Sequence, residues 1–183
     1  ERDFQVARGS VEVIPNFVDL DRFKPCTYQG IRNHLQAEGK YVLTHVSNFR
    51  PVKRVDDVVR GFAALRSKLD AVLVLVGDGP ELPKALALAK ELGVRDDLRV
   101  LGKMNDLEKI YQASDIFLLP SLAESFGLSA LEAQACGVPV IGYRAGGLPE
   151  VVIDGETGIL CPAGKNVCLG GLAADLLIDR DRH

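Results

Sequence analysis

Three kinds of residue that could bind a single ligand recur in this sequence: cations, closely spaced glycines and glutamates. Arg50, Lys53 and Arg54 are three cations within five residues. Such cations form charge-assisted hydrogen bonds with phosphate groups. Gly77 and Gly79 flank a single residue, and glycine allows a backbone to approach a ligand closely. This combination predicts a site for an anionic ligand.

Two glutamates, Glu124 and Glu132, are separated by seven residues. A helix expected to begin near Gly127 would offer its unpaired N–H groups and its partial positive charge to a diphosphate. Glu132 lies one turn into that helix, and helical side chains lean toward the N-terminus, so its carboxylate could hold a ribose. Glu124 is placed for a second polyol, on the other side of the diphosphate. Ribose, diphosphate and sugar in a row describe a nucleotide sugar.

Short apolar runs that alternate with helical patterns would position these residues. The expected strands cover residues 11–14, 41–46, 71–76, 98–101, 116–119 and 138–141. The expected helices cover residues 55–68, 81–92, 106–113, 127–135 and 166–178, and residues 22–39 form a loop with a short helix. Alternating strands and helices predict an α/β fold, a Rossmann-like three-layer parallel sheet. Ligands of such sheets bind beyond the carboxyl ends of the strands, where the cations, glycines and glutamates lie.

The composition excludes several classes of protein. The chain of 183 residues has the length of one domain, 47% of its residues are hydrophobic, and its net charge is −3. That charge gives no basic field for nucleic acid, and no apolar run approaches the ~20 residues that span a bilayer. The cysteines have no metal-binding spacing, which favours reduced thiols in a cytoplasmic protein over a zinc site; they are Cys26, Cys136, Cys161 and Cys168. His45, on an expected strand, is interpreted as a packed core histidine rather than a catalytic base.

The segment from Glu124 to Glu132 resembles the EX7E motif of the GT4 family of retaining glycosyltransferases. The family is also resembled by Leu-Leu-Pro-Ser at 118–121, Ala-Cys-Gly-Val-Pro-Val at 135–140, Gly-Gly-Leu-Pro-Glu-Val at 146–151 and Asp-Gly-Glu-Thr-Gly at 154–158. Together these segments extend the resemblance over essentially the whole chain. It implies the C-terminal, donor-binding half of a GT-B enzyme, without the N-terminal half that binds the acceptor.

The resemblance also implies roles for individual residues. Glu124 would contact the hydroxyls of the donor sugar, Glu132 would hold the ribose, and Lys53 would bind the diphosphate. The backbone near Phe126 would complete the diphosphate clamp, and the stretch after the fourth expected strand would read the base. The remaining positions expected to bind substrate are Asn48, Gly77, Gly79, Lys103, Met104, Ser125, Phe126, Gly127 and Leu128.

One segment departs from the usual pattern of the family. Ser47 and Asn48 stand where a Gly-Arg pair is common, so the usual phosphate-binding arginine is missing there, and Arg50 is expected to supply its charge. Residues 47–55 instead resemble the bacillithiol-pathway members of the family, which move N-acetylglucosamine from UDP to the hydroxyl of L-malate. This resemblance implies a UDP-sugar donor, a small hydroxy acceptor and no need for a metal or other cofactor.

The expected organisation is a lead-in over residues 1–40 and a nucleotide-sugar-binding domain over residues 41–183, with homo-oligomers also open. We expect such a domain to bind its donor weakly and to transfer nothing by itself. Three alternatives stay open: a GT4 enzyme with another donor or acceptor, a UDP-sugar 2-epimerase of the GT-B fold, and a silent binding module. A NAD-binding dehydrogenase is disfavoured because no GxGxxG follows the first or second expected strand.

Overall fold

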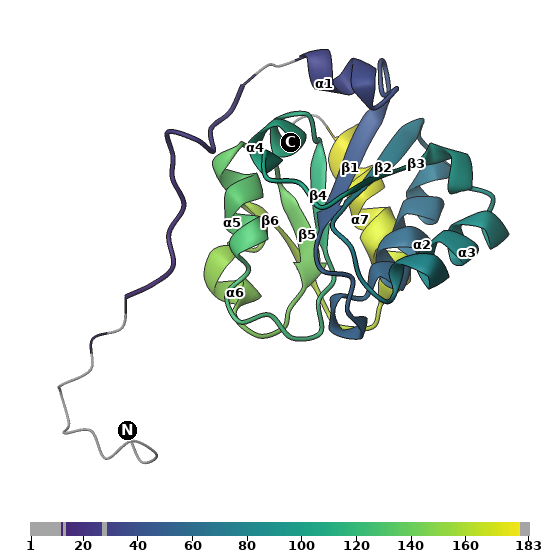
Figure 1. Cartoon of the computed structure of the whole chain (residues 1–183). Coiled ribbons are helices and arrows are strands. Elements are labelled where there is room, and N and C mark those ends of the chain that lie inside the picture. Colours follow the sequence, from purple (N-terminus) through teal and green to yellow (C-terminus); the bar gives the residue numbers. More distant parts are fainter. Residues whose placement is uncertain (1–11, 13, 27–28, 180–183) are drawn as a thin grey trace.

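A computed structural model describes residues 12, 14–26 and 29–179 of the chain. These residues build one six-stranded parallel sheet with the strand order β3-β2-β1-β4-β5-β6. The strands are β1 (Tyr41–Val46), β2 (Ala71–Val76), β3 (Leu98–Gly102), β4 (Ile116–Leu119), β5 (Val140–Tyr143) and β6 (Gly158–Cys161). Helices cover both faces of the sheet (Figure 1). The predicted three-layer α/β fold is therefore confirmed.

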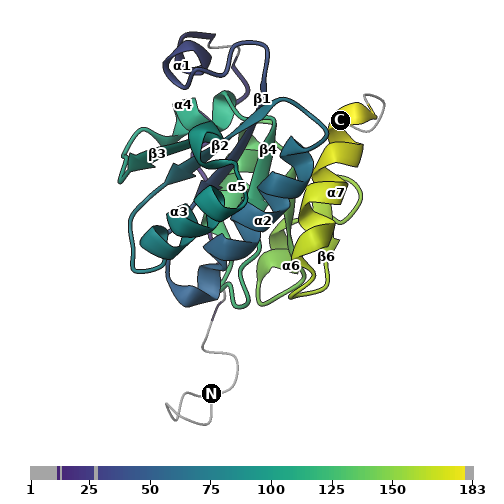
Figure 2. The same ribbon diagram turned by 90° about the vertical axis from the view of Figure 1, so that its right-hand side faces the viewer.

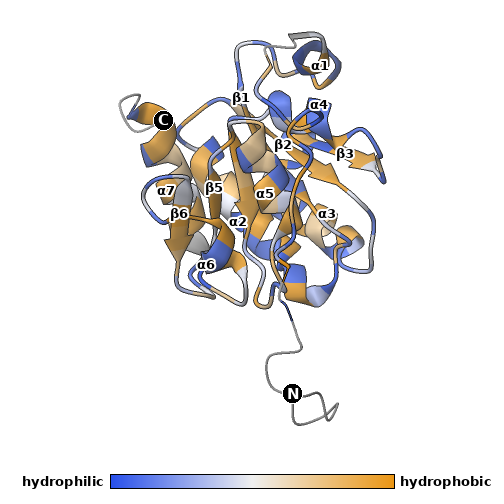
Figure 3. Cartoon of the chain, turned by 90° about the vertical axis from the view of Figure 1, so that its left-hand side faces the viewer, coloured by the Kyte–Doolittle hydropathy of each residue, from blue (hydrophilic) through white to orange (hydrophobic). Residues whose placement is uncertain are grey.

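The helices divide between the two faces. The helices are α1 (Gln29–His34), α2 (Val55–Arg66), α3 (Leu82–Glu91), α4 (Leu107–Gln112), α5 (Leu128–Ala135), α6 (Leu148–Val151) and α7 (Asn166–Ile178), with short 3₁₀ turns η1 (Pro51–Lys53) and η2 (Arg95–Asp97). Helix α2 packs between α3 and α7 on one face (Figure 2), and α4 and α5 cover the other. The apolar strands lie between these two layers (Figure 3).

Two expected strands differ from the structure, and one observed strand was not expected. The strand expected over residues 138–141 begins at Val140, because Val138 N–H bonds to Ala133 O at the end of α5 and Pro139 has no N–H to donate to a ladder. Strand β6 was not expected, because its four residues give little pattern. Of the strand expected over residues 11–14, Val11 and Val13 lie outside the described residues, and the other two belong to no strand.

The order of the strands reverses between β1 and β4, which are neighbours in the sheet. Two residue pairs join them, Leu43 with Ile116 and Thr44 with Phe117. The ladder then stops, although both strands continue for two more residues toward their carboxyl ends. In open α/β sheets the crevice at such a reversal is where ligands bind, so the fold points to the loops that follow β1 and β4.

Candidate functional site

An ion pair joins the loops that follow β1 and β4. Lys53, at the end of η1, donates from Nζ to Oε2 of Glu124 at 2.7 Å. The side chains are 20% and 13% exposed, respectively. The pair therefore lies mostly shielded from water, at the reversal of strand order. Two residues that sequence reasoning assigned to catalysis are thus brought together by the fold.

Backbone hydrogen bonds hold the Glu124 loop on two sides. Leu122 N–H donates to Val52 O at 2.9 Å, and Gly147 N–H donates to Glu124 O at 2.6 Å. A Cβ on Gly146 would lie 2.1 Å from Glu124 O, and Gly146 also has a φ of +56°. The loop after β5 can therefore approach this closely only with glycine. Sequence reasoning noted these glycines but did not foresee that they support Glu124.

Gly77 and Gly79 pack against the loop that follows β1. A Cβ on Gly77 would lie 1.8 Å from Ser47 O, and a Cβ on Gly79 would lie 2.0 Å from Asn48 O. The glycines are therefore required where the two loops meet. Contact of Asn48, Gly77 and Gly79 with a ligand stays a prediction.

The second glutamate, Glu132, lies on α5 and is held by a buried tyrosine. Tyr111 donates its hydroxyl hydrogen to Oε2 of Glu132 at 3.0 Å. Partial burial raises the pKa of the Glu132 carboxyl, while the Tyr111 hydrogen bond and the charge of Arg22 act in the opposite direction. Tyr111 is a residue of the site that sequence reasoning missed. It lies on α4, and it shares no sequence motif with Glu132.

The helix that carries Glu132 begins as expected, next to the Glu124 loop. Gly127 caps α5 with a φ of +100°, and a Cβ there would lie 3.0 Å from a methyl group of Leu148. The first N–H groups of any helix have no acceptor within that helix. Ser125 and Leu128 are exposed on either side of this cap, whereas Gly127 itself is buried. Contact between the backbone here and a diphosphate stays a prediction.

The other predicted residues are more scattered. Arg50 precedes η1, is exposed and forms no ion pair with any residue that the structure describes. Lys103 is exposed after β3, whereas Met104 packs against a cluster that includes Ile110 and Val42. Phe126 is partly exposed before α5. The fold puts all of these residues at the carboxyl ends of strands or in the loops that follow them.

His45 is a packed core residue, as predicted. Its ring is buried between β1 and β4, where Nδ1 lies 2.8 Å from Leu118 O and Nε2 lies 2.8 Å from Ser47 Oγ. Burial lowers the pKa of the ring to about 4, and the nearby charge of Lys53 acts in the same direction. The ring is therefore neutral at neutral pH.

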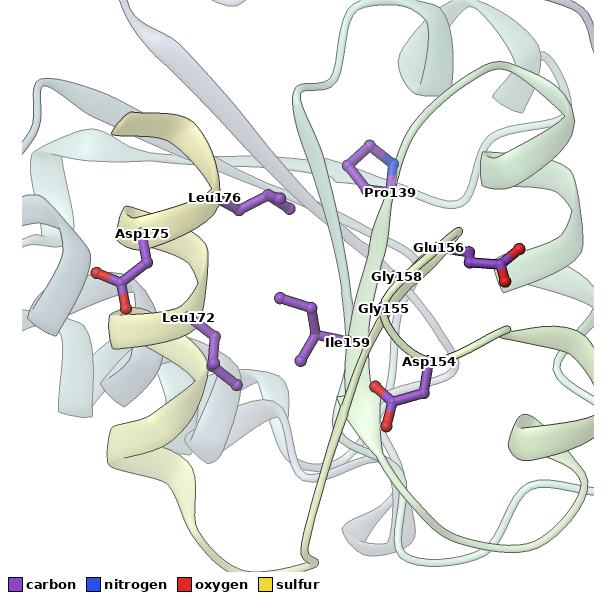
Figure 4. Close-up of a pocket in the computed structure, with 9 residues that line it drawn as sticks. All are labelled: Pro139, Asp154, Gly155, Glu156, Gly158, Ile159, Leu172, Asp175 and Leu176. Atoms are coloured by element: carbon purple, nitrogen blue, oxygen red, sulfur yellow. The ribbon is translucent and has the colours of Figure 1, made fainter. Parts of the chain in front are cut away.

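A separate hollow of about 500 Å³ lies between α7 and β6 (Figure 4). Pro139 and Gly158 line it at the amino ends of β5 and β6. Leu172 and Leu176 of α7 face it, with Asp175 nearby. The ion pair of Lys53 lies at the carboxyl ends of the strands, so this hollow is not the candidate site.

Residues 12, 14–26 and 29–179 contain no group of three or more His, Cys, Asp or Glu side chains that could hold a metal ion. None of the helices in these residues is long and apolar enough to cross a membrane. All four cysteines are free thiols there.

Known proteins resemble this chain in sequence over most of its length. The family of glycosyl transferases group 1 matches residues 29–182. N-acetyl-alpha-D-glucosaminyl L-malate synthase of Bacillus anthracis is 45% identical over 175 residues, which cover 94% of this chain and 46% of that enzyme. D-inositol 3-phosphate glycosyltransferase of Actinosynnema mirum is 44% identical over 83% of this chain and 40% of its own length. The chain thus spans less than half of these curated relatives.

Solved structures resemble the fold equally well. HepE of Anabaena, crystallised with UDP and glucose, superposes with a TM-score of 0.87 and 26% identity over 93% of this chain and 48% of HepE. The C-terminal domain of a group 1 glycosyl transferase from Francisella tularensis gives a TM-score of 0.77 and 25% identity over 91% of this chain and 90% of that domain. The fold matches the C-terminal half of GT-B glycosyltransferases.

Proposed function

The chain belongs to the glycosyl transferases group 1, and from this we propose that it binds the nucleotide-sugar donor of a retaining glycosyltransferase. The observation that carries the proposal is the shielded ion pair of Lys53 and Glu124 where the strand order reverses. A cation for the diphosphate and a carboxylate for the sugar stand side by side there. The start of α5 adds N–H groups to the same place.

Donor binding would exchange partners within this pair. The diphosphate brings more negative charge to Lys53 than one carboxylate does, so Lys53 would turn to the diphosphate. Glu124 would then accept hydrogen bonds from the hydroxyls of the donor sugar. Glu132, whose Oε2 is already held by Tyr111, would accept hydrogen bonds from the ribose. Lys103 and Met104 would border the base.

In the transfer step that we propose, the bond between the sugar's anomeric carbon and the diphosphate oxygen breaks. Lys53, Arg50 and the N–H groups of α5 would stabilise the charge that develops on the leaving diphosphate. The acceptor hydroxyl would attack from the same face, its oxygen forming the new bond while its proton passes to the diphosphate. Retention of configuration follows, and Glu124 orients the sugar without acting as the nucleophile.

For the donor and acceptor we propose UDP-N-acetylglucosamine and L-malate. The support is the 45% identity to the Bacillus anthracis enzyme named for that product and the likeness to HepE, which was crystallised with UDP-glucose. The acceptor would be bound by a second domain, with residues 1–40 leading into the donor domain of residues 41–183. No metal is required, because cationic groups and helix N–H groups supply the positive charge.

Calorimetric titration of the chain with UDP, UDP-N-acetylglucosamine, GDP and NAD tests the donor proposal. We expect the UDP compounds to bind. Lys53→Ala and Glu132→Ala should each lower the affinity for these compounds by about tenfold or more. Lys84→Ala is the matched control, because Lys84 also pairs with a glutamate but its side chain is 75% exposed on α3. Preferential binding of NAD, or UDP binding that neither variant changes, would contradict the proposal.

The acceptor proposal needs a protein that carries both halves of the enzyme. Incubated with UDP-N-acetylglucosamine and L-malate, it should release UDP and form the α-glycoside of malate, with glycerate and inositol 3-phosphate as comparison acceptors. Release of free 2-epimerised sugar without an acceptor would instead identify a UDP-sugar 2-epimerase.

A further inference from the structure

We propose that His45 and Ser47 are positioning residues that set the separation between the Lys53 loop and the Glu124 loop. The inference rests on the proposed function, because it concerns how the same site is shaped to bind a diphosphate. It assigns a role to a buried polar chain that the transfer step itself does not use.

The backbone pairing of β1 and β4 stops before either strand ends. Their ladder ends at Thr44 and Phe117, so His45 and Leu118 are the first residues beyond it. The His45 ring bridges the two strands there, with Nδ1 2.8 Å from Leu118 O. A side chain thus replaces a ladder hydrogen bond at the point where the strands separate. The ring therefore links the two strands beyond the end of their ladder.

The hydrogen bonds around the His45 ring run in one direction. A carbonyl oxygen can only accept, so His45 Nδ1 carries the hydrogen and donates to Leu118 O. Because the ring is neutral at neutral pH, His45 Nε2 carries no hydrogen and accepts from Ser47 Oγ–H at 2.8 Å. Ser47 Oγ in turn accepts from Phe49 N–H at 3.1 Å. These hydrogen bonds form a continuous series from Phe49, in the loop that follows β1, to Leu118 in β4.

The loop that follows β1 has an unusual backbone conformation where these hydrogen bonds hold it. Phe49 has a φ of +37°, in the left-handed region that non-glycine residues rarely adopt. Its ring is fully buried and stacks on the His45 ring at 5.9 Å between centroids. Phe49 O also accepts from Glu81 N–H at 3.0 Å. The unusual backbone of the loop is therefore fixed from both sides.

The loop that follows β1 continues directly to the ion pair of Lys53 and Glu124. Phe49 is followed after one residue by η1, which ends at Lys53. Within this segment, Val52 O accepts a hydrogen bond from Leu122 N–H, which ties the segment to the loop that follows β4. Lys53 and Glu124 are both near enough to His45 for their charges to act on its ring. Loss of the Ser47 hydroxyl should therefore displace Lys53 relative to Glu124.

The test compares Ser47→Ala with Ser114→Ala in the whole chain. Ser114 Oγ is also buried, with hydrogen bonds to Thr44 Oγ1 at 2.5 Å and Ile110 O at 2.7 Å, but it precedes β4 at the opposite end of the strand. We expect Ser47→Ala to weaken UDP binding by about threefold to tenfold, the usual worth of a hydrogen bond, and to leave uridine binding unchanged. Ser114→Ala should lower the melting temperature without changing either affinity. Ser47→Thr, which keeps a hydroxyl, should restore UDP affinity.

Several results would overturn the inference. If Ser47→Ala weakens the binding of UDP and of uridine equally, the hydroxyl supports the fold in general and does not position the loop that carries Lys53. If UDP affinity is unchanged in Ser47→Ala, the loop keeps its position without the hydrogen bonds of Ser47. If the unmodified chain binds no UDP, the proposed function itself fails, so the two failures are distinguishable.

Discussion

Acidification from pH 7.5 to pH 5 should destabilise the fold through His45. The ring is fully buried, and its pKa is lowered from 6.5 to about 4, chiefly by burial and further by the charge of Lys53, while a hydrogen bond to Leu118 and the charge of Glu124 oppose the shift. Once unfolded, the ring takes up a proton below its ordinary pKa of 6.5. Between the two pKa values the unfolded chain therefore binds more protons, and the free energy of unfolding falls as the pH falls.

The size of this effect follows from the position of the pKa values. At pH 5 the unfolded ring lies about 1.5 pH units below its ordinary pKa, and each unit is worth about 1.36 kcal/mol. The folded ring is still mostly neutral there. His45 should thus cost about 2 kcal/mol of stability at pH 5 that it does not cost at pH 7.5.

Urea unfolding of the chain and of His45→Gln, measured from pH 7.5 to pH 5, tests this number. Other groups also titrate in this range. Glu132, whose pKa is raised by burial, works in the opposite direction because its folded form holds its proton more readily. The difference between the two proteins removes such contributions. His45→Gln should be the less stable protein at pH 7.5, and the gap should shrink by about 2 kcal/mol at pH 5.

The control is His34→Gln, because His34 is exposed on α1. It should give a curve parallel to that of the unmodified chain. If the gap between His45→Gln and the unmodified chain stays constant over this pH range, the ring is not held neutral by burial.

Two more predictions concern single contacts. Tyr111→Phe removes a hydrogen bond that lowers the pKa of Glu132, so the carboxyl should titrate at a higher pH in carbon-detected NMR, and an unchanged value would contradict the contact. Adjacent glycines of α7 should respond in opposite ways to alanine. Gly170→Ala places a Cβ 2.2 Å from Gly61 O and should lower stability by about 1–3 kcal/mol, whereas Gly171→Ala meets open space and should raise it by about 0.5–1 kcal/mol. Thermal unfolding measures both, and equal shifts would refute the packing argument.

Local patterns determined most of the fold. The apolar run over residues 71–76 predicted strand β2, and all six of its residues are buried. Boundaries failed where a neighbouring element decided them, as at Val138, which is held by the end of α5. Strand β6 was missed because four residues carry almost no periodicity, and its place comes from pairing with β5.

The sequence alone also determined the types of residue in the site, because each chemical task restricts the choice. Cations form charge-assisted hydrogen bonds with phosphates and carboxylates accept hydrogen bonds from hydroxyls. Lys53 is therefore the predicted partner of a diphosphate and Glu124 the predicted partner of a sugar. The tertiary structure decided which residues meet: Lys53 and Glu124 are 71 positions apart, and Tyr111 reaches Glu132 from another helix. It also revealed that Gly146 and Gly147 support the Glu124 loop. Contacts of this kind depend on strand order and on the packing of distant loops, which are set by burial of the whole core rather than by any local pattern.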